Sequence, residues 1–192
     1  MGGLDKKHIT DNPAPDIIKG VISMRIEPGK IINAYRIKSL IGSGGMGEIY
    51  LAEEQLLGRQ VAIKRLNPQL TGDAHFSERF INEARIQAKL IHPNIVALYN
   101  FFIHDNEYYM VMEYAEGQTL RDLIASIGPI PEARAMKFFQ QIAQALSYAH
   151  SKSIIHRDIK PGNIMVDQQD NVKIMDFGIA RIVSDAILPR RG

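Results

Sequence analysis

The sequence predicts an α+β protein with two lobes, an antiparallel sheet with one helix followed by a mainly helical part. Between Tyr35 and Ile63, apolar residues alternate with polar ones in the period of β-strands, and glycines interrupt the pattern. From Leu120 onward, the longer apolar patterns have the period of an amphipathic helix. Because strands come first and helices later, we expect segregated elements, with a boundary near residues 115–119.

Composition excludes several classes of protein. The 192 residues are 45% hydrophobic and 23% charged, which is typical of a globular domain. The net charge of +2 is made of mixed charges, so binding to nucleic acid through bulk charge is not expected. Cysteine is absent, which excludes disulfides, thiolate metal sites and cysteine nucleophiles. No apolar run approaches the ~18 residues of a membrane helix and no secretion signal is present, so we expect a cytoplasmic protein.

The first part of the chain is expected to contain a flexible extension and then the sheet. Residues 1–32 are interpreted as the extension, because their first half is polar and rich in proline. Residues 33–114 are expected to form the first lobe, with turns at Gly42–Gly47 and at Gly58. Its predicted elements are strands near 35–41, 49–51 and 61–63, a helix over 77–90, and strands over 95–103 and 107–114.

The second part, residues 115–192, is expected to be mainly helical. The apolar spacing predicts a short helix over 120–127, closed by Gly128-Pro129, and a long helix over 132–152. Two short strands are predicted at 163–166 and 172–175. Met112 and the pair Phe138/Phe139 are interpreted as core positions.

A glycine-rich stretch with Gly42, Gly44 and Gly47 joins the first two predicted strands. A P-loop would require Gly-Lys-Ser/Thr at its end, which is absent. A dinucleotide-binding fold would require a following helix, whereas residues 48–52 alternate like a strand. A hairpin remains, which is either an ordinary glycine-rich turn or a cover whose backbone N–H groups bind phosphates.

Lys64, on the third predicted strand, is a candidate phosphate ligand. Val61 and Ile63 face away from it, so Lys64 points to the same side as Ala62, under the glycine loop. A lysine there can neutralise phosphate oxygens. Glu83, in the predicted helix, could pair with Lys64 and hold it in place. Taken singly, each residue is more often a solvated surface side chain.

The run from His156 to Asn163 gathers the most specific chemistry. Asp158 can accept or orient a hydroxyl proton, and Lys160 can stabilise charge on a transferring phosphoryl group. Asn163 supplies a hard oxygen suited to Mg²⁺, and Asp176, at the end of the following hairpin, supplies a second. His156 is interpreted as structural, because no third metal ligand has a suitable spacing.

These motifs occur in the order in which protein kinases carry them, and the chain resembles a bacterial, eukaryotic-like serine/threonine protein kinase catalytic domain. The resemblance covers roughly Tyr35 to Arg181, and the run IGSGGMGEIYLAE is similar to bacterial members in particular. It implies the two-lobed kinase fold, with an N-lobe over 33–114 and a partial C-lobe over 115–192. It also implies ATP and Mg²⁺ as cofactors and a protein with serine or threonine as substrate.

The resemblance further implies a role for each candidate residue. The three glycines cover the ATP phosphates, and Lys64 contacts the α- and β-phosphates while paired with Glu83. Asp158 acts as catalytic base, assisted by Lys160, a lysine typical of serine/threonine kinases, and Asn163 and Asp176 hold Mg²⁺. The rest of the nucleotide is expected to contact Ile41, Ile49, Ala62, Met112, Glu113, Ala115 and Met165. A stacked set that aligns the lobes is expected from Gln87, Leu98, His156 and Phe177.

The pattern departs from the family after Asp176-Phe177-Gly178. No Ala-Pro-Glu occurs in residues 179–192, and the later helices of the large lobe are not encoded in this sequence. Without them, the apolar side of the helix over 132–152, including Phe138 or Phe139, would face water and favour a protein partner or self-association. The alternatives to an active kinase are therefore a catalytically silent ATP-binding module and a non-functional fragment.

Overall fold

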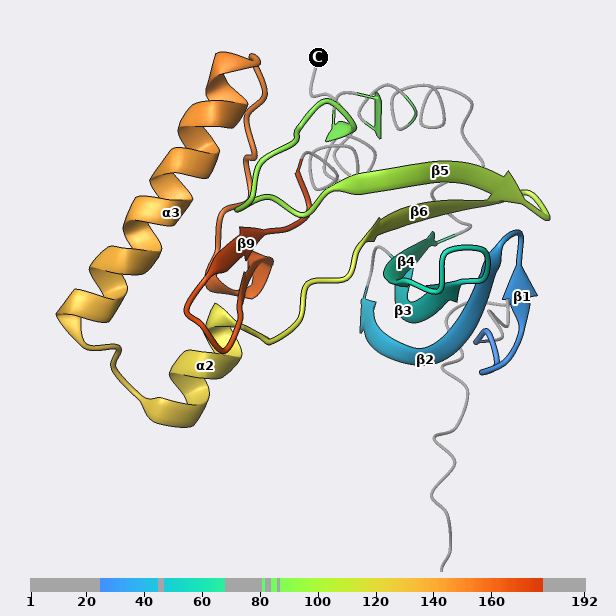
Figure 1. Cartoon of the computed structure of the whole chain (residues 1–192), viewed down its shortest axis with the longest axis horizontal. Helices are drawn as coiled ribbons and strands as arrows, with labels where there is room; N and C mark the ends of the chain where they lie inside the picture. Colours follow the sequence, from blue (N-terminus) through green and yellow to red (C-terminus); the bar gives the residue numbers. More distant parts are fainter. Residues whose placement is uncertain (1–24, 45–46, 68–80, 82–83, 86, 178–192) are drawn as a thin grey trace, which may run out of the picture.

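The fold has two lobes, with the strand β9 and its loop between the large sheet and the long helix (Figure 1). The computed structural model describes residues 25–44, 47–67, 81, 84–85 and 87–177. The N-lobe sheet has the strand order β1-β2-β3-β4-β6-β5 and is antiparallel throughout. Its strands are β1 (Ile31–Ile32), β2 (Tyr35–Gly44), β3 (Gly47–Glu54), β4 (Gln60–Leu66), β5 (Leu98–His104) and β6 (Glu107–Glu113).

The C-lobe combines two helices with a small sheet. The three-stranded sheet has the order β7-β8-β9, and a single turn of 3₁₀ helix precedes β8. The elements are β7 (Gln118–Thr119), α2 (Leu120–Ile127), α3 (Glu132–Ser151), η2 (Pro161–Asn163), β8 (Ile164–Val166) and β9 (Val172–Ile174). The two-lobed α+β fold expected from the sequence is therefore confirmed. Within the described ranges, no helix is both long and apolar enough to cross a membrane.

Strand β4 separates two hydrophobic clusters, one on each face of the N-lobe sheet. Val61 and Ile63 pack with Tyr50 and Val111 on the outer face, away from the C-lobe residues. Ala62 packs on the other face, in the cluster that also holds Leu66, Met110 and Met112. Since successive side chains of a strand alternate, Lys64 lies on the Ala62 side, as the sequence predicted.

Residues just before the expected start of the N-lobe at residue 33 contact its sheet. Ile32 is 1% exposed and Ile26 is 8% exposed, and both belong to the outer hydrophobic cluster. Strand β1 pairs with β2 through Ile31 and Ile32. Ile26 and Ile32 therefore pack against the sheet of the lobe, whereas Ile31 is exposed. The rest of the predicted extension lies outside the described residues.

The two described helices follow their sequence signals closely. Helix α2 has the predicted bounds, since the Thr119 side chain accepts a hydrogen bond from the Asp122 N–H at its start and Gly128 ends it with a positive φ. Helix α3 begins after Pro131 and ends one residue before the prediction. Of the helix predicted over 77–90, only residues 81, 84, 85 and 87 are described as helical.

Adjacent phenylalanines on α3 have opposite environments. Phe138 is 3% exposed and packs with Leu123, Ile164 and Val172. Phe139 is 66% exposed, so its interpretation as a core residue was wrong. One helical position rotates the side chain by about 100°, which carries Phe139 off the buried stripe.

Candidate active site

A β-hairpin brings the two predicted magnesium ligands to neighbouring chain positions. Strands β8 and β9 pair in register from Ile164 with Ile174. One step beyond this pair, the Met175 N–H donates to the Asn163 carbonyl at 2.9 Å. Asn163 and Asp176 therefore lie at the same end of the hairpin, although thirteen positions separate them in the sequence. The length of the predicted hairpin had indicated that these two residues would lie close together.

The loop before this hairpin is held by hydrogen bonds among its polar residues. The Asp158 carboxylate accepts from Lys160 Nζ at 2.7 Å and from Asn163 Nδ2 at 2.9 Å. Asn163 Nδ2 also donates to the Asp158 carbonyl at 2.8 Å. The hydrogen bond from Lys160 is the main reason that the pKa of Asp158 lies below its usual value, and the bond from Asn163 acts in the same direction. Asp158 is therefore a carboxylate at neutral pH, as a hydrogen-bond acceptor for a substrate hydroxyl must be.

Lys64 reaches across the two lobes to the second predicted metal ligand. Its Nζ lies 2.9 Å from Asp176 Oδ1, and Lys64 is only 3% exposed. Because the Lys64 ammonium is buried next to this carboxylate, Lys64 is not a solvated strand lysine. Its predicted partner Glu83 lies outside the described residues, so the Lys64–Glu83 pair remains a prediction.

The glycine-rich stretch forms the predicted hairpin between β2 and β3. Gly42 is opposite Ile49 and Gly44 is opposite Gly47, while residues 45–46 lie outside the described ranges. Gly47 has φ +130°, and a Cβ added there would lie 2.0 Å from the Arg65 carbonyl oxygen. Only glycine fits this position, because the hairpin passes directly against the backbone of β4.

The predicted adenine-contacting residues gather where the lobes meet. Ala62 and Met112 are opposite each other in the β4–β6 pair, and Ile49 and Ala115 pack in the same cluster. Ile41 is 47% exposed at the start of the hairpin. Ile49, Ala62, Met112 and Ala115 therefore lie on the face of the N-lobe sheet that also holds Lys64.

An open cavity of about 650 Å³ runs beside the segment that joins the lobes. Its lining includes Glu113, Ala115 and Met165, three of the predicted nucleotide contacts. It continues outward to the β8–β9 turn and does not include Lys64 or Asp158 among its lining residues. Ile41, Ile49, Ala62 and Met112 are also absent from its lining, so the cavity includes only part of the predicted nucleotide contacts.

His156 has the structural role expected from the sequence. It is 2% exposed, its Nδ1 accepts from the Asp158 N–H at 3.2 Å, and its Nε2 lies 2.7 Å from the Met175 carbonyl. This network assigns the proton to Nε2. The ring also packs edge-on against Phe177, with centroids 4.6 Å apart. His156 therefore joins the Asp158 loop to the segment that carries Asp176.

Sequence reasoning missed two polar connections that hold the site. Lys173 Nζ lies 2.8 Å from Glu113 and donates to the Pro93 carbonyl at 2.8 Å, so it connects the two lobes. Gln141 of α3 accepts from Asn94 Nδ2 and from the Val172 N–H, each at 2.9 Å. The buried alternation of β9 could have placed Lys173 on the Met165 side, but no local signal indicates the role of Gln141.

The donor set at the end of the β8–β9 hairpin fits Mg²⁺. An amide oxygen from Asn163 and a carboxylate from Asp176 are hard oxygen ligands. Among the residues that the structure describes, no group of three or more His, Asp or Glu side chains forms a metal site.

Comparisons with known proteins agree with this geometry. The family described as protein kinase domain matches residues 35–188. Serine/threonine-protein kinase PrkC of Bacillus subtilis is 44% identical over 159 residues, covering 83% of this chain and 24% of that protein. Serine/threonine-protein kinase PknB of Mycobacterium tuberculosis is 42% identical over 163 residues, covering 83% of this chain and 26% of that protein.

A solved structure supports the same assignment. The kinase domain of PknI from M. tuberculosis aligns with a TM-score of 0.73 and 28% identity, over 81% of this chain and 62% of that one. The chain spans about a quarter of the length of the curated relatives it matches. On the family match and these identities, the chain belongs to the protein kinase family and is similar to its bacterial serine/threonine members.

Proposed function

We propose that this chain provides the catalytic residues of a cytoplasmic protein serine/threonine kinase, which transfers the γ-phosphoryl group of ATP to a protein hydroxyl. One observation carries the proposal. Two hydrogen-bonded polar groups meet at one end of the β8–β9 hairpin: Asp158 with Lys160 and Asn163, and Lys64 with Asp176. Phosphoryl transfer depends mainly on positioning and charge, which such a set supplies.

In this proposal, the substrate hydroxyl donates a hydrogen bond to the Asp158 carboxylate. Its oxygen forms a bond to the γ-phosphorus while the bond from that phosphorus to the bridging oxygen of ADP breaks, and the hydroxyl proton passes to Asp158. Lys160 lies close enough to Asp158 to offset charge on the transferring group.

The nucleotide would lie beneath the glycine hairpin. Backbone N–H groups of Gly42, Gly44 and Gly47 would face its phosphates, and Lys64 would contact the α- and β-phosphates. Asn163 and Asp176 would hold Mg²⁺, which neutralises charge on the phosphate oxygens when bound. Lys64 and Asp176 would then exchange their mutual contact for the phosphates and the cation.

The test is phosphate transfer from γ-labelled ATP to a mixed serine- and threonine-containing protein substrate, with Mg²⁺. We expect the unaltered chain to transfer label, and Asp158→Asn to lose at least about a hundredfold of this rate. Lys89→Met, at an exposed turn position, serves as the matched control and should keep the rate. Equal label incorporation by Asp158→Asn would refute the proposal.

A second candidate is a silent ATP-binding module that acts through a protein partner. The exposed apolar side chains Met136 and Phe139 on α3 favour it, since they offer a surface for association. Nucleotide binding without transfer, combined with complex formation, would support this candidate over the kinase.

A further inference from the structure

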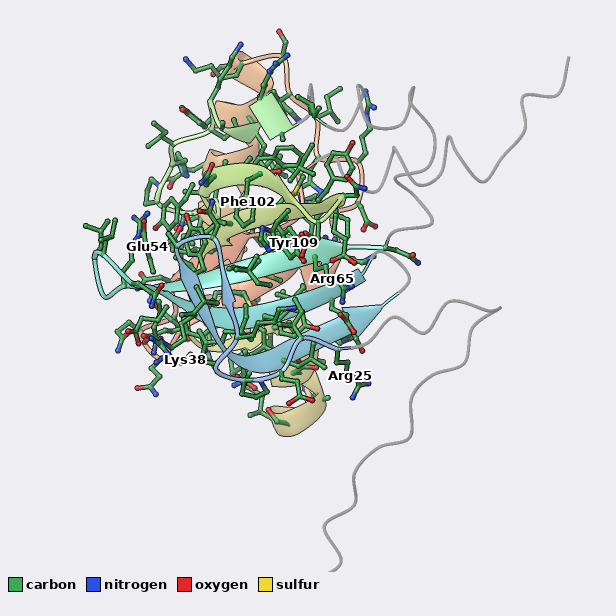
Figure 2. All side chains as sticks on the ribbon, turned by 90° about the vertical axis from the view of Figure 1, so that its right-hand side faces the viewer. Arg25, Lys38, Glu54, Arg65, Phe102 and Tyr109 are labelled. Atoms are coloured by element: carbon green, nitrogen blue, oxygen red, sulfur yellow. The ribbon has the colours of Figure 1, made fainter. Side chains whose placement is uncertain are left out.

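A compact charged cluster lies on the outer face of the N-lobe sheet, opposite the face that holds Lys64. Its centre is Arg65, at the end of β4. Arg65 Nε donates to Glu107 Oε2 at 2.6 Å, and Arg65 Nη2 donates to Glu107 Oε1. Tyr109 adds a hydroxyl bond to the same carboxylate at 2.8 Å. Figure 2 shows Arg65 close to Tyr109, with Glu54 at the other end of the sheet.

The charged cluster also includes contacts with β3. Arg65 Nη1 lies 3.4 Å from Glu48 Oε2, and the Tyr50 hydroxyl donates to the same oxygen at 2.6 Å. The Tyr50 oxygen in turn accepts from the Ile26 N–H at 2.9 Å. Arg65 therefore connects the carboxylate of Glu48 on β3 with that of Glu107 on β6.

The carboxylate of Glu107 keeps its charge at neutral pH. Burial opposes ionisation of Glu107, but hydrogen bonds from Arg65 and Tyr109 lower its pKa below the usual value. Burial and the bond to Glu48 raise the pKa of Tyr50 to about 12, so the phenol keeps its proton. A guanidinium between two carboxylates with little exposure is a strong and directional contact.

The charged cluster lies next to the base of the glycine hairpin. Glu48 follows Gly47 directly, and it is opposite Arg65 in the β3–β4 pair. Gly47 lies against the Arg65 carbonyl so closely that no Cβ fits between them. The next residue back, Lys64, projects from the opposite face of the same strand. Arg65 thus contacts the hairpin through both its backbone carbonyl and its side chain. It also follows Lys64, the predicted phosphate ligand, directly in the sequence.

We propose that Arg65 is a positioning residue that fixes the base of the glycine hairpin, at the paired residues Gly44 and Gly47, relative to the nucleotide phosphates. It does so by holding Glu48, at the base of the hairpin, to Glu107 on β6. This inference rests on the proposed function, because it assumes that phosphates lie under the hairpin. It assigns the cluster to phosphate binding and not to adenine binding, which takes place farther along the sheet.

A comparison of two ligands separates this role from general structural support. Adenosine has no phosphates and would use only the apolar end of the site, whereas Mg²⁺·ATP would also use the hairpin. We expect Arg65→Met to weaken Mg²⁺·ATP binding at least about tenfold, since small misplacements of a binding loop are costly. The same variant should change adenosine binding by less than about twofold.

The matched control is Arg59→Met. Arg59 pairs with Glu54 at 2.5 Å, at the opposite end of the same β3–β4 hairpin. This variant removes an ion pair of the same chemistry without touching the glycine hairpin, so the affinity for both ligands should stay unchanged. Calorimetry on the full chain, with a thermal melt of every variant, measures these effects.

The outcomes separate a failure of the inference about Arg65 from a failure of the proposed function. Equal weakening of both ligands in Arg65→Met would show structural support only, and unchanged binding of both would show no role; either result overturns the inference. If Arg65→Met does not melt cooperatively, Glu48→Gln provides the same comparison, because it keeps the acceptor for Tyr50 but removes the charge. Failure of the unaltered chain to bind either ligand would instead refute the proposed function.

Discussion

At the scale of single residues, Gly47 shows most directly how sequence constrains the site. Its φ of +130° and the carbonyl of Arg65 beside it leave no space for a side chain. We expect Gly47→Ala to destabilise the chain by more than the ~1–3 kcal/mol typical of backbone strain, because a steric clash adds to it. Chemical denaturation measures the change.

Gly58→Ala is the matched control for this prediction. Gly58 also has a positive φ, +65°, but no atom lies within 4 Å of an added Cβ. This variant therefore carries the strain of the backbone without the clash, and it should cost about 1 kcal/mol. Equal losses in the two variants would contradict the steric argument for Gly47.

His156 gives a prediction on pH dependence. Burial lowers its pKa below the free value of 6.5, although the bond to Met175 and the carboxylates of Asp176 and Asp158 oppose this shift. The unfolded chain therefore binds the proton more readily than the folded one. The stability that His156 contributes is present above about pH 6.5 and is lost as the pH falls through that value toward the folded pKa.

Two measurements test whether the pKa of His156 is lowered in the folded chain and whether stability falls with pH as expected. A proton NMR titration of the folded chain should give His156 a pKa below 6.5. The thermal midpoint of the unaltered chain should also fall more between about pH 7.5 and 5.5 than that of His156→Gln, which cannot bind the proton. A folded pKa above the free value would reverse the expected slope.

Lys64 shows which features of a single residue the sequence could predict and which it could not. The alternation of β4 predicted the direction of Lys64 correctly, because a strand fixes it locally. Its partner Asp176 is 112 residues away, and their contact depends on how the lobes meet. No local pattern contains that information, so the sequence analysis named a pair within the N-lobe only.

At the scale of elements, helix α3 provides a test with neighbouring residues of the same type. Phe138 is buried against α2 and the small sheet, whereas Phe139 is 66% exposed. Phe138→Ala should destabilise the chain by ~3–5 kcal/mol, as expected for a buried phenylalanine. Phe139→Ala should change stability by less than about 0.5 kcal/mol. Urea denaturation of both variants measures the difference, and similar losses would contradict the assigned orientation of the helix.

The same helix holds the β8–β9 hairpin through Gln141. Besides its two accepted bonds, its Nε2 donates to the Asp170 carbonyl at 2.9 Å. Gln141→Met would leave the Asn94 amide and the Val172 N–H without this acceptor, at a cost of ~1–3 kcal/mol for each buried group that stays unpaired. Gln140→Met, at an exposed position of the same helix, should be nearly neutral. A stable Gln141→Met variant with unchanged denaturation would refute this role.

The elements that the sequence predicted well have strong local signals. The bounds of α2 followed from the apolar period and Gly128, and the Thr119 cap that the structure adds also acts within a few residues. Strands β1 and β7 have two residues each and were not predicted, since alternation cannot be read over so short a run. The polar contacts of Gln141 also depend on segments distant in sequence, which explains why they were missed.

At the scale of the whole molecule, the lobes share a hydrophobic cluster and a backbone connection. Leu90 and Ile95, in the N-lobe segment before β5, pack with Ala145, Ala149 and Phe177. The Val96 N–H donates to the Ile174 carbonyl at 2.9 Å, which joins the same segment to β9. Because each lobe buries apolar surface against the other, we expect one cooperative unfolding transition rather than two.

The proposed site then predicts how this transition responds to nucleotide. Mg²⁺·ATP would contact both lobes, so it stabilises the folded chain only where the lobes are assembled. At ~100-fold above the dissociation constant, it should add ~2.7 kcal/mol to the free energy of unfolding. Thermal melts that follow far- and near-ultraviolet circular dichroism measure both the shift and the cooperativity.

Asp176→Asn is the informative variant in these melts. It keeps the shape of the side chain but removes the negative charge that pairs with Lys64 and would hold the cation. The nucleotide-dependent rise should shrink strongly, while adenosine should still raise the midpoint, because adenosine needs neither the cation nor Lys64. Two separate transitions, or a rise of equal size in Asp176→Asn, would show that the lobes do not form one site for the nucleotide.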